Sequence, residues 1–248
     1  TVNGALLKKG PGMLIITNRS TNVDNLNGKS VVVSNGTLVL GPNRTDTAGH
    51  IRVETNTIFR MFNDNFIANS SIIQVNGGLF DAYGRSDTIA YFTGGGVLTN
   101  MNGIINMNGA VSTYYFDGLI HGAGSFYLQN AGGFFQPRAA SPFGGDMVVT
   151  PGGGLILTNN TILTNAVIAI NTNNALVLMN DTAWTFGGLG GAGALGMTNT
   201  AGATINLTLG NNNSSNASFM GALTGGGSLT KVGSGSTGEA IGVGSIEG

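Results

Sequence analysis

The chain has 248 residues, a formal net charge of −1 and no cysteine. This composition excludes a basic surface for nucleic acid, a disulfide framework and a thiolate metal site. Only 8% of the residues are charged, whereas 41% are hydrophobic and 43 are glycine; an average domain has roughly 25% charged residues. We therefore expect a surface that is poorly protected against self-association.

The sequence contains no run that approaches the roughly 18 apolar residues of a membrane-spanning helix. It opens at Thr1, without an initiator Met or a basic-then-apolar leader. We therefore expect a processed chain or an excised fragment, with no membrane span in this segment.

Short apolar runs bounded by Gly and Asn recur along the chain, and helical periodicity is nearly absent. The first strands are expected at Met13–Thr17, Ser30–Val33 and Thr37–Leu40, and the last two are separated by the corner Ser34–Gly36. The same pattern of strand, corner and strand returns at Val75–Phe80, Met101–Ile105, Val149–Leu157, Ile170–Leu178 and Ala201–Leu207. The spacing of these corners predicts a solenoid with roughly 20–28 residues per turn.

A longer motif joins a phenylalanine to a glycine-rich turn. Phe116–Phe126 matches Phe219–Leu229 without a gap, and Phe186–Leu195 matches with one residue fewer. We expect the phenylalanine to point into the core and the glycines to lie against the neighbouring turn, where a Cβ would meet backbone.

Residues 1–232 are predicted to form one solenoid domain. The more irregular segments Arg19–Gly28, Gly41–Gly49 and Ala131–Asp146 are expected to project from it as loops. The Gly/Ser-rich segment 233–248 is expected to be a tail that is flexible or ordered by a neighbouring subunit.

The segment Gly4–Gly12 is repeated at Gly227–Gly235, 223 residues further on, with glycine, leucine and lysine at matching places. Together with Gly4–Ile16, this repeat resembles the autotransporter-associated β-strand repeat of bacterial surface proteins. The resemblance implies an all-β chain, folded as a single right-handed parallel β-helix with short loop excursions. It also implies a location outside a bacterial cell or on its surface, and it does not imply catalysis.

The ends of such a solenoid are predicted to be the functional site. End turns expose unpaired backbone and apolar side chains, and a head-to-tail contact that does not close on itself produces a filament. We expect the contact to involve Leu6, Leu14, Leu223 and Leu229. The favoured function is a structural subunit of an extracellular or cell-surface filament whose partner is another copy of the chain. The alternative is an adhesin passenger segment of a larger protein, which would bind host or glycan surfaces.

Candidate chemistry is sparse. Asp81 and Asp87, preceded by Asp64, are one candidate carboxylate pair for glycoside hydrolysis, which needs two carboxylates about 5–10 Å apart. A solvated loop is the favoured interpretation, with Tyr83 and Arg85 as candidate glycan contacts. The chain is therefore not expected to be an enzyme or to need a cofactor.

The remaining residues that could bind a ligand are two histidines and one tryptophan. His50 and His121 lack the spacing of a metal site and are expected to be ordinary surface or turn residues. Trp184 is expected to lie in the core, with stacking on a sugar as the alternative.

Overall fold

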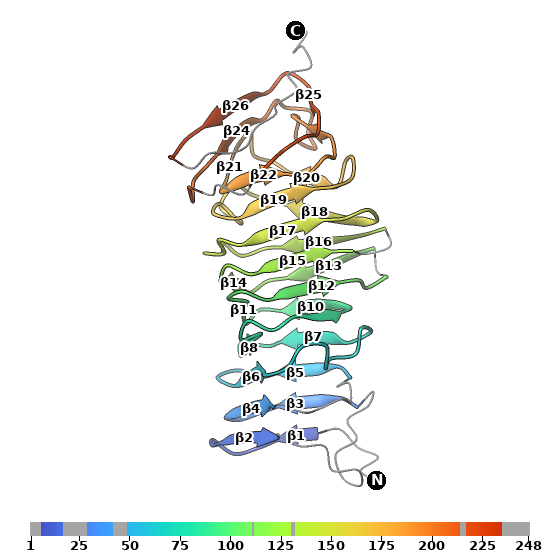
Figure 1. Cartoon of the computed structure of the whole chain (residues 1–248), viewed down its shortest axis with the longest axis vertical. Helices are drawn as coiled ribbons and strands as arrows, with labels where there is room; N and C mark the ends of the chain where they lie inside the picture. The colour runs from blue at the N-terminus through green and yellow to red at the C-terminus, as the bar shows by residue number, and fades with distance from the viewer. Residues whose placement is uncertain are drawn as a thin grey trace.

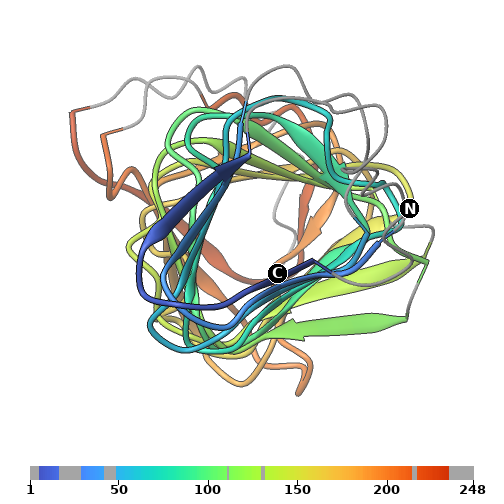
Figure 2. The same cartoon turned by 90° about the horizontal axis from the view of Figure 1, so that it is seen from below.

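A computed structural model describes residues 6–16, 29–41, 49–110, 112–129, 132–213 and 217–234. These residues form a parallel β-solenoid of about ten turns that contains no helix (Figure 1). Seen from the N-terminal end, the chain runs clockwise as it recedes, so the solenoid is right-handed (Figure 2). The predicted all-β parallel β-helix is confirmed.

Each regular turn passes through three faces. The first face is a nine-stranded sheet of β1 (Leu6–Lys8), β3 (Val31–Val33), β5 (Ile51–Val53), β7 (Ile72–Val75), β10 (Tyr91–Gly94), β13 (Thr113–Phe116), β16 (Gly133–Pro137), β18 (Gly153–Leu157) and β20 (Leu176–Leu178). The second face contains β2 (Met13–Ile16), β4 (Thr37–Leu40), β6 (Ile58–Met61), β8 (Leu79–Asp81), β11 (Val97–Thr99) and β14 (Leu119–His121). The third face contains β9 (Asp87–Ile89), β12 (Ile104–Met107), β15 (Ser125–Leu128), β17 (Asp146–Val149), β19 (Val167–Ile170) and β22 (Gly188–Gly190).

Two smaller sheets continue two of these faces to the C-terminal end. A three-stranded sheet of β21 (Ala183–Phe186), β24 (Asn206–Leu209) and β26 (Ser228–Lys231) continues the second face. A two-stranded sheet of β23 (Leu195–Gly196) and β25 (Leu223–Thr224) continues the first face. In chain order β21 lies between β20 of the first face and β22 of the third, which is the place of a second-face strand in the earlier turns. By the same reasoning β23 lies on the first face. Hence β25 ends the first face and β26 ends the second.

The strand register gives the length of each turn. Paired residues on adjacent turns are 18 residues apart at Leu79 and Val97, and 28 apart at Leu195 and Leu223. Most other turns fall between these values, close to the 20–28 residues expected from the corners. Because all of these pairs are parallel, each turn extends the same backbone ladder along the axis.

The core is a set of inward ladders. Val33, Val53 and Val75 stack on successive turns and are fully buried. Aromatic rings continue the core along the axis, with ring centroids 5.4 Å apart for Phe59 and Phe80. Burying a side chain of this size contributes about 1.5–3 kcal/mol. The repeated apolar positions therefore stabilise every turn through its neighbours.

The predicted Phe–Gly motif behaves as expected. Phe116 is fully buried, and a Cβ on Gly118 would strike the Gly96 carbonyl oxygen of the preceding turn and the Phe116 ring. Gly221 meets the Phe219 ring and the Gly193 carbonyl in the same way. Glycine is therefore required there by close packing rather than by backbone dihedral angles.

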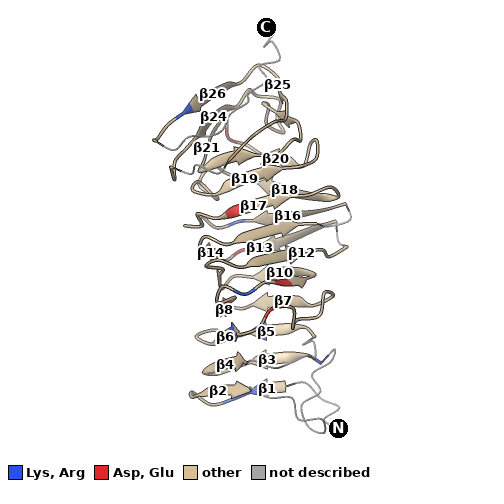
Figure 3. Ribbon diagram, viewed as in Figure 1, with Lys and Arg blue, Asp and Glu red and all other residues tan. Residues whose placement is uncertain are grey.

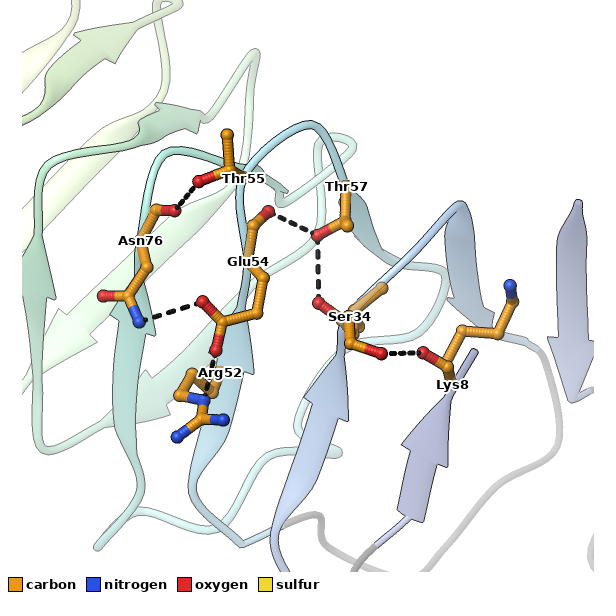
Figure 4. A network of polar contacts seen from close by, with 8 residues as sticks. Lys8, Ser34, Arg52, Glu54, Thr55, Thr57 and Asn76 are labelled. Atoms are coloured by element: carbon orange, nitrogen blue, oxygen red, sulfur yellow. Dashed lines mark hydrogen bonds and ion pairs between the residues drawn. The ribbon is translucent and has the colours of Figure 1, made fainter. Parts of the chain in front are cut away.

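The corner between the first and second faces is held by hydrogen bonds along the axis (Figure 4). The Ser34 hydroxyl donates to the Lys8 carbonyl at 3.0 Å, and the Thr57 hydroxyl donates to the Glu54 carbonyl at 2.7 Å and faces the Val33 carbonyl at 3.1 Å. On the following turn, the Asn76 amide donates to a Glu54 carboxylate oxygen at 3.3 Å. These bonds give the polar corner residues partners on neighbouring turns.

One loop prediction was wrong. The segment Ala131–Asp146 was expected to project, but it contains β16, which pairs with β13 and β18 in the middle of the first face. Phe135 and Phe143 are buried in the core, and this apolar burial outweighs the turn-forming Pro137 and Pro142. The expected loop Arg19–Gly28 and positions 42–48 of the loop at Gly41–Gly49 lie outside the described residues.

The expected tail is described only at its start. The backbone N–H of Ser234 donates to the Asn213 side chain of the preceding turn at 2.9 Å, so Gly233 and Ser234 still belong to the solenoid. Residues 235–248 lie outside the described residues.

Candidate functional site

The two ends of the solenoid present strands on the same two faces. The first described turn consists of β1 and β2, and the last ends with β25 and β26 (Figure 1). Each of these strands is the outermost member of its sheet, so none has a described neighbour on its outer side. Among the described residues, the outer edges of these four strands therefore have no strand paired with their backbone donors and acceptors.

The four leucines predicted to form the assembly contact lie on these end strands. Leu6 pairs with Val31 and Leu14 with Leu38 at the N-terminal end. Leu223 pairs with Leu195 and Leu229 with Leu207 at the C-terminal end. Their partners are buried core residues, so all four leucines occupy inward positions of the core ladders. The structure does not bring the two pairs together within one chain, since they lie at opposite ends.

Further apolar side chains are exposed on the same end turns, and the sequence analysis missed them. At the N-terminal end, Met13 is 65% exposed and Ile15 52%, and at the C-terminal end Met220 is 69% exposed. Charged residues are sparse along the ribbon of the rod (Figure 3). Both ends therefore combine an open strand edge with apolar surface, which favours association.

The two copies of the sequence repeat share a local structure. The Lys8 ammonium donates to the Gly10 carbonyl at 2.7 Å and to the Lys9 carbonyl at 3.3 Å. The Lys231 ammonium makes the equivalent contacts with Val232 and Gly233. In both copies the lysine therefore satisfies the carbonyl groups of the tight corner that follows its own strand.

The environments of the two lysines differ. Lys8 lies beneath Val33 of the next turn, is only 6% exposed and also donates to the Asn35 carbonyl at 3.0 Å. Lys231 is exposed, because no described turn lies above it.

The repeat copies occupy different faces, which corrects the simplest interpretation of the sequence repeat. Lys8 ends β1 on the first face, whereas Lys231 ends β26 on the second. Their separation is therefore ten turns plus one face. Superposing one copy of the repeat on the other therefore requires a rotation of a third of a turn about the solenoid axis, in addition to a translation along it.

A second candidate site surrounds Tyr83 and Arg85. Tyr83 stacks on Phe62 with ring centroids 6.0 Å apart, and Tyr83 is 49% exposed and Phe62 36%. The Arg60 guanidinium lies 4.7 Å from the Tyr83 ring, and that of Arg85 lies 5.7 Å from the Phe62 ring. We call these four residues the aromatic cluster. The sequence analysis missed Phe62 and Arg60, although each lies one turn before a residue of the expected loop.

Asp81 supports this cluster. Its carboxylate accepts hydrogen bonds from Arg60 Nε at 2.7 Å, from the Tyr83 backbone N–H at 2.9 Å and from the Thr99 hydroxyl at 3.0 Å. The bond to the Tyr83 N–H helps to hold that residue in the left-handed region, with a φ of 52°. Asp81 therefore fixes the orientation of Tyr83 and balances the charge of Arg60.

Asp87 has a different environment. It is 1% exposed, and one carboxylate oxygen accepts the backbone N–H groups of Phe66 at 3.0 Å and Ile67 at 2.9 Å. The other oxygen accepts the Thr88 N–H at 2.7 Å. Burial raises the pKa of Asp87 to about 6; the three N–H donors lower it and the nearby charge of Asp64 raises it further. Asp87 thus accepts the N–H groups of a buried corner, and Asp81 pairs with Arg60. The expected solvated loop was wrong for these two carboxylates, because both are buried and lie in strands.

Among the remaining candidate residues, Trp184 and His50 make local hydrogen bonds. Trp184 is 1% exposed and its indole N–H donates to the Asp181 carbonyl at 2.9 Å, which confirms the core interpretation. His50 Nδ1 accepts the Ile72 backbone N–H at 2.9 Å, and His121 ends β14, the last strand of the six-stranded sheet of the second face. Among the described residues, no group of three or more His, Asp or Glu side chains is arranged to hold a metal ion.

Comparison of the chain with protein-family models, curated proteins and solved structures found no match. The resemblance to the autotransporter-associated repeat thus stays a prediction from the motifs at the two ends. Within the described residues, no helix has the length and apolar character needed to cross a membrane.

Proposed function

We propose that the chain is a structural subunit of an extracellular or cell-surface bacterial filament, in which copies assemble head to tail through the solenoid ends. The observation that carries this proposal is that both ends present open strands on the same two faces, with inward leucines at the edge of the core. A second copy placed on the end would continue the backbone ladder and the core together.

The extracellular and bacterial parts of the proposal rest on the sequence motifs at Gly4–Ile16 and Gly227–Gly235. The low share of charged residues supports a self-associating surface. The engaged carboxylates of Asp81 and Asp87 favour a structural role over catalysis.

The test is negative-stain electron microscopy of the purified chain across a concentration series, with two single variants. Leu229→Lys places a charge in the inward ladder of β26 and is expected to abolish filaments. Thr230→Lys changes the neighbouring outward residue of the same strand and is expected to leave filaments intact. Circular dichroism checks that both variants keep the β fold.

Isolated short rods of the unmodified chain at every concentration would overturn the filament proposal. Filaments of Leu229→Lys as abundant as those of the unmodified chain would exclude the C-terminal end as the contact.

The aromatic cluster favours one second candidate, an adhesin segment that binds glycans. Exposed aromatic rings and guanidinium groups are groups that contact sugars, and Asp81 orients Tyr83 among them. Binding of labelled polysaccharides by the unmodified chain, lost in Tyr83→Ala and retained in Tyr115→Ala, would support this function. Tyr115 is the matched control because it is also exposed and also lies against an arginine, Arg138.

A further inference from the structure

The proposed filament leaves open how each added copy is rotated about the axis. Three arrangements place strands on strands, because the solenoid has three faces. The incoming β1 can lie above the first, second or third face of the copy below, and β2 then lies above the next face. The described residues distinguish these arrangements by edge pairing, by core continuity and by charge.

Edge pairing favours the arrangement without rotation. With β1 above the first face and β2 above the second, the two incoming strands cover β25 and β26 together. With a rotation of one third, β1 covers β26 and β25 stays open. With a rotation of two thirds, β2 covers β25 and β26 stays open. Only the unrotated arrangement pairs all four described end strands.

Core continuity gives the same answer. Without rotation, Leu6 lies above Leu223, and Leu14 lies above Leu229. Within each copy Leu223 lies above Leu195 and Leu229 above Leu207, so both apolar ladders run on without interruption. The four leucines of the assembly contact thus form two defined pairs.

Charge argues against a rotation of one third. That rotation aligns the two sequence repeats, so Leu6 would lie above Leu229 and Lys8 directly above Lys231. Two ammonium groups would then occupy consecutive places in one inward ladder, about 4.8 Å apart along the axis, where like charges repel and solvent screening is reduced.

In the unrotated arrangement, Lys231 instead has the same environment as Lys8 has within one chain. Pairing Leu14 with Leu229 places Ile16 above Lys231. Lys8 has the same position beneath Val33, where it is buried and donates to the corner carbonyls. The incoming copy would therefore bury Lys231 as the second turn buries Lys8.

We propose that copies add without rotation, with β1 on β25 and β2 on β26, so that Leu6 lies on Leu223, Leu14 on Leu229 and Ile16 on Lys231. This inference rests on the proposed filament. It names the second copy's N-terminal turn as the partner of the C-terminal edge and specifies the register of the contact.

The chain has no cysteine, so introduced cysteine pairs report the register directly. Adjacent strands are about 4.8 Å apart, within the Cα separation of about 4.4–6.8 Å that a disulfide spans. The double variants Leu7→Cys/Thr224→Cys and Ile15→Cys/Thr230→Cys place cysteines opposite each other only without rotation. The double variant Leu7→Cys/Thr230→Cys does so only with a rotation of one third. All four positions are exposed or lie on the outward side of their strands.

Filaments are assembled under reducing conditions, checked by electron microscopy, oxidised and analysed on non-reducing gels. The expected result is a ladder of covalent multimers for the first two double variants and monomer for the third, with each single variant reaching dimer at most. A ladder for the third variant alone, or filaments in which none of the variants is linked, would overturn the proposed register and leave the filament standing. Absence of filaments from the unmodified chain would overturn the filament itself.

Discussion

At the scale of single residues, the buried polar groups determine how the corners are closed. Lys8 serves three carbonyl groups at one corner, and Asp87 accepts three N–H groups at another. Buried donors and acceptors without partners cost about 1–3 kcal/mol each. These two side chains therefore replace backbone hydrogen bonds that the sharp corners cannot make.

Asp87 predicts a pH dependence of stability. Its pKa is raised to about 6 from an ordinary value of 3.8, so between these pH values the folded chain holds a proton that the unfolded chain releases. The free energy of unfolding should therefore fall as the pH rises from about 4 to about 6, by up to about 3 kcal/mol from this group, and level off above.

Urea denaturation followed by circular dichroism at several pH values tests this prediction. Asp87→Asn should flatten the slope, since the amide oxygen can still accept the Phe66 and Ile67 N–H groups but no longer titrates. Asp64→Asn is the matched control and should retain most of the slope. Equal slopes for the unmodified chain and Asp87→Asn would exclude Asp87 as the cause.

At the scale of structural elements, the spacing between adjacent strands limits which residues fit at a corner. The Phe–Gly motif shows this limit, because the glycine lies directly against a carbonyl of the neighbouring turn. A side chain there would push two turns apart, and this displacement would disturb the ladder bonds on both sides.

Gly118→Ala is therefore expected to lower the free energy of unfolding by about 1–3 kcal/mol, the usual cost of overpacking. Gly144→Ala is the matched control, because a Cβ there meets no heavy atom within 4 Å. Chemical denaturation at constant pH measures both variants. Equal stability of the two variants would contradict the packing explanation.

At the scale of the whole molecule, about ten turns form one rod with an open strand edge at each end of its described part (Figure 1). Turns in such a sheet are about 4.8 Å apart. Head-to-tail stacking should therefore give filaments with an axial repeat of roughly 50 Å per subunit.

Power spectra of filament images and fibre diffraction measure these two spacings. A meridional reflection near 4.8 Å together with the longer axial repeat would agree with stacking along the solenoid axis. A 4.8 Å reflection perpendicular to the filament would show that the rods associate side by side.

Much of the fold was readable from the sequence because its causes are local. The corner at Ser34–Gly36 was predicted correctly, and Gly36 has a φ of 71°, which glycine adopts without strain. The apolar runs at Met13 and Thr37 were also placed correctly, since short runs rich in Val, Ile and Leu between Gly/Asn turns favour β-strands. Composition, turn chemistry and periodicity therefore sufficed for the all-β solenoid.

Only the tertiary structure determines which residues and strands are neighbours, both around the rod on its three faces and along the rod on adjacent turns. The sequence repeat predicted equivalent copies at the two ends, but their faces depend on the summed lengths of all the turns between them. The aromatic cluster likewise joins Phe62 to Tyr83 from adjacent turns. Strand β16 was missed because Pro137 and the following Pro142 indicate a loop locally, whereas the burial of Phe135 and Phe143 is a property of the complete core. Local sequence determines strands and corners, and register accumulated over many turns determines which residues meet.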